Sequence, residues 1–166
     1  MKTSISVAVV ALLALTSCTT TKEYKILAKS KTETQGTVKF TQTGKTVKMD
    51  IMAYKLSPGI HAVHIHEKGD CSSADGTSAG GHWNPAGNDH GKWESEHFHM
   101  GDIGNITADK DGTSRFVFST DKWCLGCKDE SKNILEKSLI IHAAKDDFHT
   151  QPTGNAGGRV GCVEIK

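Results

Sequence analysis

The chain has 166 residues, enough for one domain, and its first 17 residues are expected to be removed. Without Lys2, 19 basic residues balance 19 acidic ones. This balance argues against nucleic acid as a partner, because nucleic-acid binding needs a concentrated basic face. With 36% hydrophobic residues and 17 glycines, the composition favours a β-rich domain with long ordered loops.

Residues 1–17 have the pattern of a secretory signal peptide, with a charged start and an apolar run at 7–15 that is too short to span a bilayer. The run ends in Leu-Thr-Ser-Cys at 15–18, which resembles the bacterial lipobox. An ordinary signal peptide with a chance cysteine is the alternative. We expect a lipidated Cys18, a short polar tether to residue 23 and one domain at 24–166. The protein would be exported and anchored at the bacterial cell envelope, on the periplasmic side or the outer surface.

Alternating apolar and polar residues predict β-strands from residue 24 onward. The stretches 36–41 and 47–51 flank the turn signal at 43–45 and predict a hairpin. Ser57-Pro58-Gly59 then interrupts the chain before a strand at 60–66.

The strand at 60–66 predicts two faces of different character. Val63 and Ile65 share one face, and His64 and His66 share the other, so both imidazoles project together. His61 falls on the apolar side, and we expect it to be packed and hydrogen-bonded rather than a metal ligand.

Residues 68–99 show no sustained period, and a loop of that length in a compact domain is normally functional or disordered. Strands are expected at 102–107 and 114–119, followed by a turn of helix at 128–137. A strand at 138–143, a second polar loop and a last strand at 159–165 complete one domain without internal repeats.

Seven of the nine histidines lie between His61 and His99, and histidine is the commonest metal-ligating side chain. His82, His90, His99 and Asp102 form a set of three imidazoles and one carboxylate, which suits structural zinc. His64, His66 and His142 add nitrogen ligands without thiolate, which suits copper. An adventitious surface cluster is the alternative, and two complete sets in one frame argue against it.

Four cysteines remain besides Cys18, and in an oxidising compartment they can pair in three ways. Cys124 and Cys127 are close enough for a local disulfide, which would leave Cys71 with Cys162. The alternative for Cys124 and Cys127 is a thiol pair that binds Cu(I) or exchanges with the other disulfide.

Four stretches resemble the copper/zinc superoxide dismutase family, and the likeness extends over about residues 24–165. They are 61–67 (HAVHIHE), 80–85 (GGHWNP), 99–102 (HMGD) and 154–159 (GNAGGR). The resemblance implies an all-β fold, a flattened eight-stranded Greek-key β-barrel (an immunoglobulin-like sandwich) with two long functional loops.

The resemblance also implies roles for individual residues. Copper would be bound by His64, His66, His82 and His142, and zinc by His82, His90, His99 and Asp102, with one ion of each per chain. His82 would bridge both ions as an imidazolate, which two flanking dications favour. Asp146 would link the two sites by hydrogen bonds, Arg159 would receive the superoxide anion, and Cys71 would pair with Cys162.

The implied activity is disproportionation of superoxide to dioxygen and hydrogen peroxide, with copper cycling between Cu(II) and Cu(I) and zinc structural. His82 and Arg159 would be the catalytic residues. The alternative is a copper- and zinc-binding envelope protein of the same fold without turnover. The sequence leaves a monomer and a homodimer open.

Some positions depart from the family pattern or match no ligand position. The loop at 143–158 is shorter than in the animal enzymes and holds one lysine, Lys145, so Lys68 and Lys92 are candidates for steering superoxide. We expect a rate that falls with ionic strength. His97 and His149 are expected to be surface histidines, and the glycosylation pattern at Asn105 is discounted because it lies in a strand.

Overall fold

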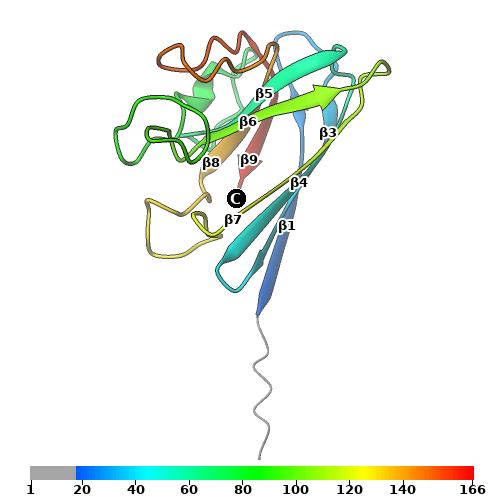
Figure 1. Cartoon of the computed structure of the whole chain (residues 1–166). Coiled ribbons are helices and arrows are strands. Elements are labelled where there is room, and N and C mark those ends of the chain that lie inside the picture. The colour runs from blue at the N-terminus through cyan, green and yellow to red at the C-terminus, as the bar shows by residue number, and fades with distance from the viewer. Residues whose placement is uncertain (1–17) are drawn as a thin grey trace, which may run out of the picture.

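The computed structural model describes residues 18–166, and the expected signal peptide lies outside them. Two antiparallel sheets pack against each other, with strand orders β1-β3-β4-β7 and β2-β9-β8-β5-β6 (Figure 1). The strands are β1 (Thr19–Lys25), β2 (Leu27–Ala28), β3 (Gln35–Thr43), β4 (Thr46–Tyr54), β5 (Gly59–His66), β6 (Asp102–Ala108), β7 (Ser114–Thr120), β8 (Lys137–His142) and β9 (Arg159–Ile165). The all-β sandwich is confirmed. One extended segment is divided at Ile26 into β1 and β2, which belong to different sheets. The described residues therefore form nine strands rather than the expected eight.

The alternation seen in the sequence places the core between the sheets. In the predicted hairpin, β3 and β4 pair with Val38 opposite Ile51 and Phe40 opposite Met49, and all four side chains are buried. The turn between them contains Gly44 in the left-handed region, at φ 60°. The facing sheet contributes buried aliphatic residues from β5, β8 and β9 to the same cluster. This two-layer core fixes the ends of the strands from which the functional loops depart.

Two local predictions are wrong. Residues 19–23, expected to be a tether, belong to β1 and pair with β3, from Thr19 opposite Thr43 onward. Residues 128–137, expected to hold a turn of helix, contain hydrogen-bonded turns and then the first residue of β8. The amides of Lys132 and Asn133 both donate to the carbonyl of Asp129, whose side chain also accepts a hydrogen bond from Ser131. Such short polar side chains compete with helical hydrogen bonding.

Helix is scarce in the described part of the chain. Residues 18–166 contain one 3₁₀ turn, η1 (Thr77–Ala79). Nowhere in this range is there a helix of the length and apolar character needed to cross a membrane.

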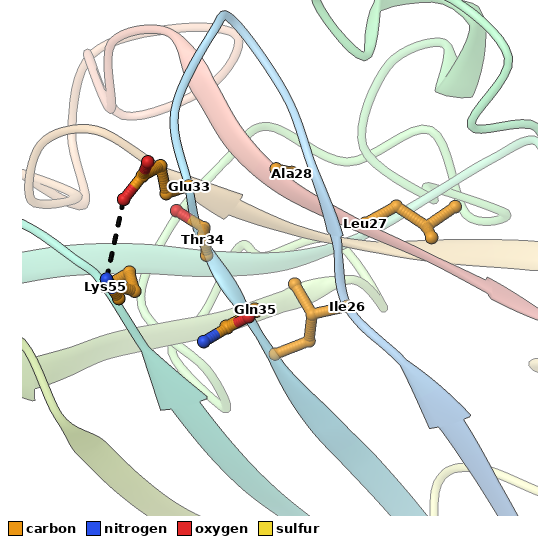
Figure 2. A pocket seen from close by; sticks show the side chains of 7 residues that line it. All are labelled: Ile26, Leu27, Ala28, Glu33, Thr34, Gln35 and Lys55. Carbon is orange, nitrogen blue, oxygen red and sulfur yellow. Dashed lines mark ion pairs between the residues drawn. The ribbon is translucent and has the colours of Figure 1, made fainter.

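The segment that joins β2 to β3 lies beside the start of β9. The amide of Lys29 donates to the carbonyl of Val160 at 3.0 Å, and the amide of Ile26 donates to Gly36 at 2.9 Å. A surface groove of about 520 Å³ runs along this segment, crossed at one side by an ion pair between Lys55 and Glu33 (Figure 2). None of the described residues that line this groove is a histidine.

Two long loops, 67–101 between β5 and β6 and 143–158 between β8 and β9, carry most of the candidate site. Both lie toward the end of the sandwich that is farther from the start of β1 (Figure 1). Gln151 ties the loops together, since its side chain accepts a hydrogen bond from the amide of His90 and donates one to the carbonyl of His90. The irregular segments are therefore ordered against one another.

Candidate metal centre

The end of β5 supplies the first two histidines of the centre. His64 and His66 project from the same face of the strand and are fully buried beneath the loops. The sheet register shifts between Val63 and His64 on β5 and between Ile141 and His142 on β8. Such irregularities change the direction of side chains. Here they come directly before two of the predicted ligands.

The structure brings the predicted ligands together in two groups of four buried residues. In each group, one ligand-type atom from every residue lies within 4.8 Å of the others. One group is His64, His66, His82 and His142, and the other is His82, His90, His99 and Asp102. His82 belongs to both, and an isolated bridge with His66 holds it against β5.

Five of these histidines hydrogen-bond an oxygen outside their group through one ring nitrogen, which leaves the other nitrogen available for a metal. In the first group, the Nε2 atoms of His66 and His142 lie 3.4 Å from each other. The hydrogen-bonded nitrogens are Nε2 of His64 (to Asp146), Nδ1 of His66 (to Gly80 O), Nε2 of His90 (to Asp146), Nε2 of His99 (to Asn88 O) and Nδ1 of His142 (to Gly157 O). His82 differs, because Nδ1 faces Asp102 of the second group at 2.9 Å while its buried Nε2 has no hydrogen-bond partner among residues 18–166.

Four buried ring nitrogens have no hydrogen-bond partner within residues 18–166. They are His64 Nδ1, His82 Nε2, His90 Nδ1 and His99 Nδ1. An unsatisfied buried polar atom costs about 1–3 kcal/mol, so four in one place call for an explanation. Metal coordination provides one. Four imidazoles without thiolate suit copper, and three imidazoles with a carboxylate suit zinc, so the donor sets present fit both metals.

Asp102 supplies the carboxylate of the second group. Its oxygens lie 3.0 Å from His90 Nδ1 and 3.2 Å from His99 Nδ1, and they accept hydrogen bonds from the amides of His99 and Gly91. Burial by itself raises the pKa of Asp102, but the hydrogen bond from His82 and the close rings of His90 and His99 outweigh it and hold this pKa well below its usual range. The carboxylate is therefore ionised and ready to bind a cation.

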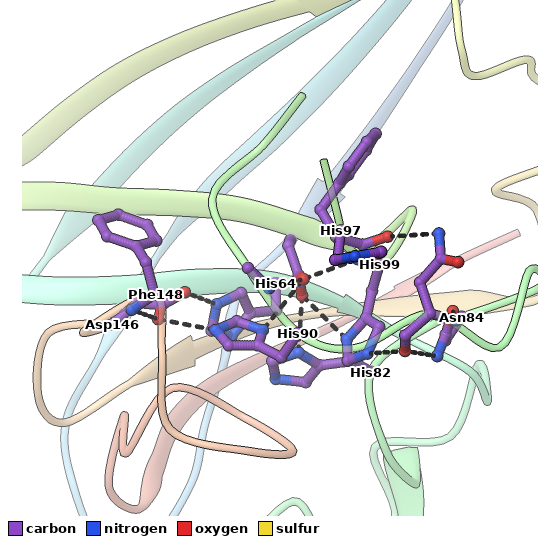
Figure 3. A network of polar contacts seen from close by, with 12 residues as sticks. His64, His82, Asn84, His90, His97, His99, Asp146 and Phe148 are labelled. Carbon is purple, nitrogen blue, oxygen red and sulfur yellow. Dashed lines mark hydrogen bonds and ion pairs between the residues drawn. The ribbon is translucent and has the colours of Figure 1, made fainter. Parts of the chain in front are cut away.

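Asp146 connects the two groups from outside (Figure 3). Its fully buried carboxylate accepts a hydrogen bond from His64 Nε2 at 2.8 Å and from His90 Nε2 at 2.9 Å. This is the link that the family resemblance implies. Gly154 permits the approach, because its φ is +70° and a Cβ there would overlap the Asp146 carboxylate.

The electrostatics of the two groups differ. Burial, reinforced by neighbouring histidines, lowers the pKa of His142 to about 3 and that of His66 well below its ordinary value. Burial also lowers the pKa of His82, to about 4, although Asp102 opposes the shift. These imidazoles are neutral at pH 7, the form that binds metal. For His90, burial acts in the same direction, but Asp102 and Asp146 outweigh it and raise the pKa to about 9.

Arg159 lies beside the first group. It stands opposite His142 in the pairing of β8 with β9. Its Nη1 donates to the carbonyl of Gly76 and its Nη2 to the carbonyl of Gly80, each at 2.6 Å. His66 Nδ1 donates to the same Gly80 oxygen. One carbonyl therefore fixes the arginine and a candidate copper ligand relative to each other.

The remaining predicted residues lie outside the two groups. His61 is buried, with its ring nitrogens 2.7 Å from the carbonyl oxygens of His142 and Ser57, as expected for a packed histidine. His97 and His149 are exposed. The lysines considered for steering, Lys68, Lys92 and Lys145, are all exposed as well.

Sequence reasoning missed two supporting residues. Gln151 holds the main chain of His90, and Asn105 donates to the carbonyl of Asp146 and accepts from its amide. Neither residue type is specific for such a supporting role, so the sequence carries no signal for either one. The use of the Asn105 amide here also argues against a sugar at that position.

Both cysteine pairs form disulfides. Cys71 and Cys162 join the first long loop to β9, with a Cα–Cα distance of 5.9 Å and a sequence separation of 91. Cys124 and Cys127 form a local disulfide, as expected from their spacing. The long-range bond fixes the loop that carries Gly76 and Gly80 against the strand that begins with Arg159.

Comparison with known proteins agrees with this geometry. Residues 34–165 match the family described as copper/zinc superoxide dismutase (SODC). A superoxide dismutase [Cu-Zn] of Paramecium bursaria Chlorella virus 1 is 37% identical over 153 residues, which cover 87% of this chain and 79% of the relative. An extracellular superoxide dismutase [Cu-Zn] of Haemonchus contortus is 38% identical over 139 residues, which cover 80% of this chain and 74% of the relative. The chain therefore belongs to the copper/zinc superoxide dismutase family, as an oxidoreductase that acts on superoxide with copper and zinc as its metals.

Proposed function

We propose that the two groups of four residues divide the metals of the dismutase between them. His64, His66, His82 and His142 bind copper, and His82, His90, His99 and Asp102 bind zinc. The observation that carries this proposal is the set of four buried, unpartnered ring nitrogens shared between the two groups. The all-imidazole group suits copper, and the group with the carboxylate suits tetrahedral zinc.

His82 is the residue that bridges the two metals in this proposal. Asp102 holds its Nδ1 side, which leaves the buried, unpartnered Nε2 for the copper group, formed by His64, His66, His82 and His142. Copper, when bound, supplies the one-electron redox change, and zinc does not change oxidation state. His82 Nε2 is then the atom placed to hold a proton and deliver it to the reduced substrate.

Arg159 binds the substrate anion in this proposal. Its guanidinium is half-buried and keeps a permanent positive charge, and its two bonds to carbonyl oxygens orient it beside His66. A fixed cation with free donors attracts a small anion and holds it at one place.

The test measures superoxide dismutation and metal content on the same samples. We expect one copper and one zinc per chain at saturation, with activity proportional to copper up to that point. The His82→Ala variant should lose dismutase activity and should bind only one of the two metals tightly. His97→Ala and His149→Ala, which change exposed histidines, serve as controls and should keep both. A His82→Ala protein that binds both metals as tightly as wild type would contradict the bridging role.

We also propose that the protein is exported and lipid-anchored through Cys18 at a bacterial cell envelope. Supporting this are the lipobox-like sequence, the exposed free thiol of Cys18 and two disulfides, which persist in oxidising compartments. Mass spectrometry of the mature protein tests it. A diacylated N-terminal cysteine is expected, which Cys18→Ser should abolish. A mature chain that begins elsewhere, without lipid, would rule out the anchor.

A further inference from the structure

A buried lysine lies behind the candidate anion site. Lys29 follows β2, in a segment that precedes the family-matched residues 34–165. Its relative exposure is 8%, although lysine is almost never buried unless its charge is paired.

The ammonium of Lys29 is bound by main-chain oxygens. Nζ donates to the carbonyls of Cys71 and Ser73, the latter at 3.0 Å. Within the described range 18–166, these are its hydrogen-bond partners, and neither is a carboxylate. A buried charge bonded only by neutral oxygens costs free energy. The charge of Asp70 offsets part of this cost, since hydrogen bonds from Ser72 and, to a smaller extent, the charge of Lys29 lower the pKa of Asp70. The retention of Lys29 suggests a purpose beyond packing.

The carbonyls that Lys29 binds belong to the loop that holds the guanidinium of Arg159. The carbonyl of Ser73 also accepts a hydrogen bond from the amide of Gly76, whose own carbonyl accepts from Arg159 Nη1. Gly76 lies between the side chains of Lys29 and Arg159. A Cβ on it would be 3.3 Å from Arg159 Cβ and 3.4 Å from Lys29 Cγ. The stems of Lys29 and Arg159 therefore pack against the same glycine.

The same segment holds the main chain of Arg159 from the other side. Ser30 Oγ donates to the carbonyl of Arg159 at 2.8 Å, and the amide of Ser30 donates to the carbonyl of Ala74 at 2.8 Å. Thr32 Oγ1 donates to the carbonyl of Val160 at 2.9 Å. The segment after β2 thus holds Arg159 at two places. It bonds the main chain of Arg159 directly, and it holds the guanidinium through the loop from Cys71 to Gly76.

The backbone of this segment is strained. Ser30 and Lys31 have φ values of 54° and 60°, in the left-handed region that residues other than glycine rarely adopt. Such positions persist only where the surrounding contacts hold them, and they gather at functional sites. Here both residues are central in a turn that the Thr32 amide closes on the Lys29 carbonyl at 3.0 Å, and the bonds from Ser30 to Arg159 and Ala74 hold that turn in place.

We propose that Lys29 is a positioning residue for the anion site, with Ser30 as its partner. Lys29 holds the loop from Cys71 to Gly76 so that Arg159 keeps its guanidinium fixed beside the copper group, and its charge adds to the positive field there. This inference rests on the proposed role of Arg159 in anion binding.

The test uses azide, a small anion, as the probe on protein loaded with copper and zinc. The azide Kd is measured from the change in copper absorbance, on samples matched in metal content. Lys29→Met keeps the apolar stem and removes the ammonium. We expect it to raise the azide Kd roughly 5-fold, while Lys29→Arg, which retains donors for the carbonyls, recovers at least half of the lost affinity.

Lys31→Met is the matched control. It removes the same charge from an exposed side chain that lies two residues after Lys29. Its azide Kd should stay within twofold of wild type. The rate of dismutation should also fall less steeply with ionic strength in Lys29→Met than in this control. Equal azide Kd values for Lys29→Met and Lys31→Met would overturn the proposal.

Two further variants distinguish a failure of the inference about Lys29 from a failure of its premise, the anion-binding role of Arg159. Ser30→Ala removes the bond to the Arg159 carbonyl and should raise the azide Kd roughly 2-fold. If Lys29→Met does not fold, an unchanged Kd in Ser30→Ala overturns the proposal by itself. Arg159→Met tests the premise. An unchanged Kd in that variant would remove the anion-binding role of Arg159, whereas a raised Kd there with no effect at Lys29 would refute only the inference about Lys29.

Discussion

The two ligand groups share His82 and yet differ in charge. The group proposed for copper consists of imidazoles alone, and burial lowers the pKa of His66, His82 and His142. The zinc group contains Asp102, and Asp146 lies directly behind it, so the pKa of His90 rises to about 9. The first group therefore presents neutral nitrogen donors, whereas the second places negative charge around its cation. One shared histidine thus lies between a site suited to redox chemistry and a site suited to structure.

Removing an imidazole from the copper group should have the largest effect. Four-ligand zinc sites have apparent binding free energies of about 10–16 kcal/mol, so one ligand of four is worth about 3 kcal/mol, or roughly 100-fold in affinity. Taking copper to be similar, His142→Ala should lower copper affinity by about that factor and abolish most of the activity, while zinc stays bound. Competitive chelation and dismutation assays measure both. Wild-type copper affinity in this variant would contradict the assignment.

Removing the charge from the zinc group should have a large effect on zinc and a smaller one on activity. Asp102→Asn replaces the one anionic ligand, and we expect zinc affinity to fall roughly 100-fold on the same reasoning. Copper should remain bound by its four imidazoles, with part of the activity. The control is Asp89→Asn, an exposed acid in the same loop. Equal zinc affinities in the two variants would mean that Asp102 is not a ligand.

Weakening the link between the groups should affect both metals moderately. Asp146→Asn replaces an oxygen that accepts from His64 or His90 with an amide that cannot accept. Loss of such an outer hydrogen bond typically lowers metal affinity about 10–100-fold. Asp147→Asn, at the adjacent acid, should leave both affinities near wild type. An effect on a single metal would show that Asp146 supports one group only.

The smallest effect is expected from Trp123, which supports the part of the first long loop that carries His99. Trp123 is 1% exposed, and its indole N–H donates to the carbonyl of Met100 at 3.0 Å, between His99 and Asp102. Trp123→Phe removes this bond, worth about 1 kcal/mol, and should speed zinc release to a chelator roughly 5-fold. Trp93→Phe changes the same aromatic cluster and serves as the control. Identical release rates would remove the hydrogen bond from consideration.

The sequence predicted the parts of this molecule whose signal is periodic or chemically rare. Strand alternation located the sheets, and the spacing of His64 and His66 placed both on one strand face. The errors at residues 19–23 and 128–137 arose because polar residues fit several local structures, and the choice was made by contacts with β3 and by side-chain hydrogen bonds within the loop. Lys29 and Trp123 could not be predicted, since their roles depend on partners 42 and 23 residues away along the chain.

The shared positions of His82 and Asp146 have a thermodynamic consequence. Because both residues contact both groups, a metal in one group changes the free energy of binding in the other, and such coupling is reciprocal. Whatever factor zinc contributes to copper affinity, copper must contribute to zinc affinity. The affinities of the two sites are therefore linked, and the order of loading affects the rates at which the sites fill but not the final state.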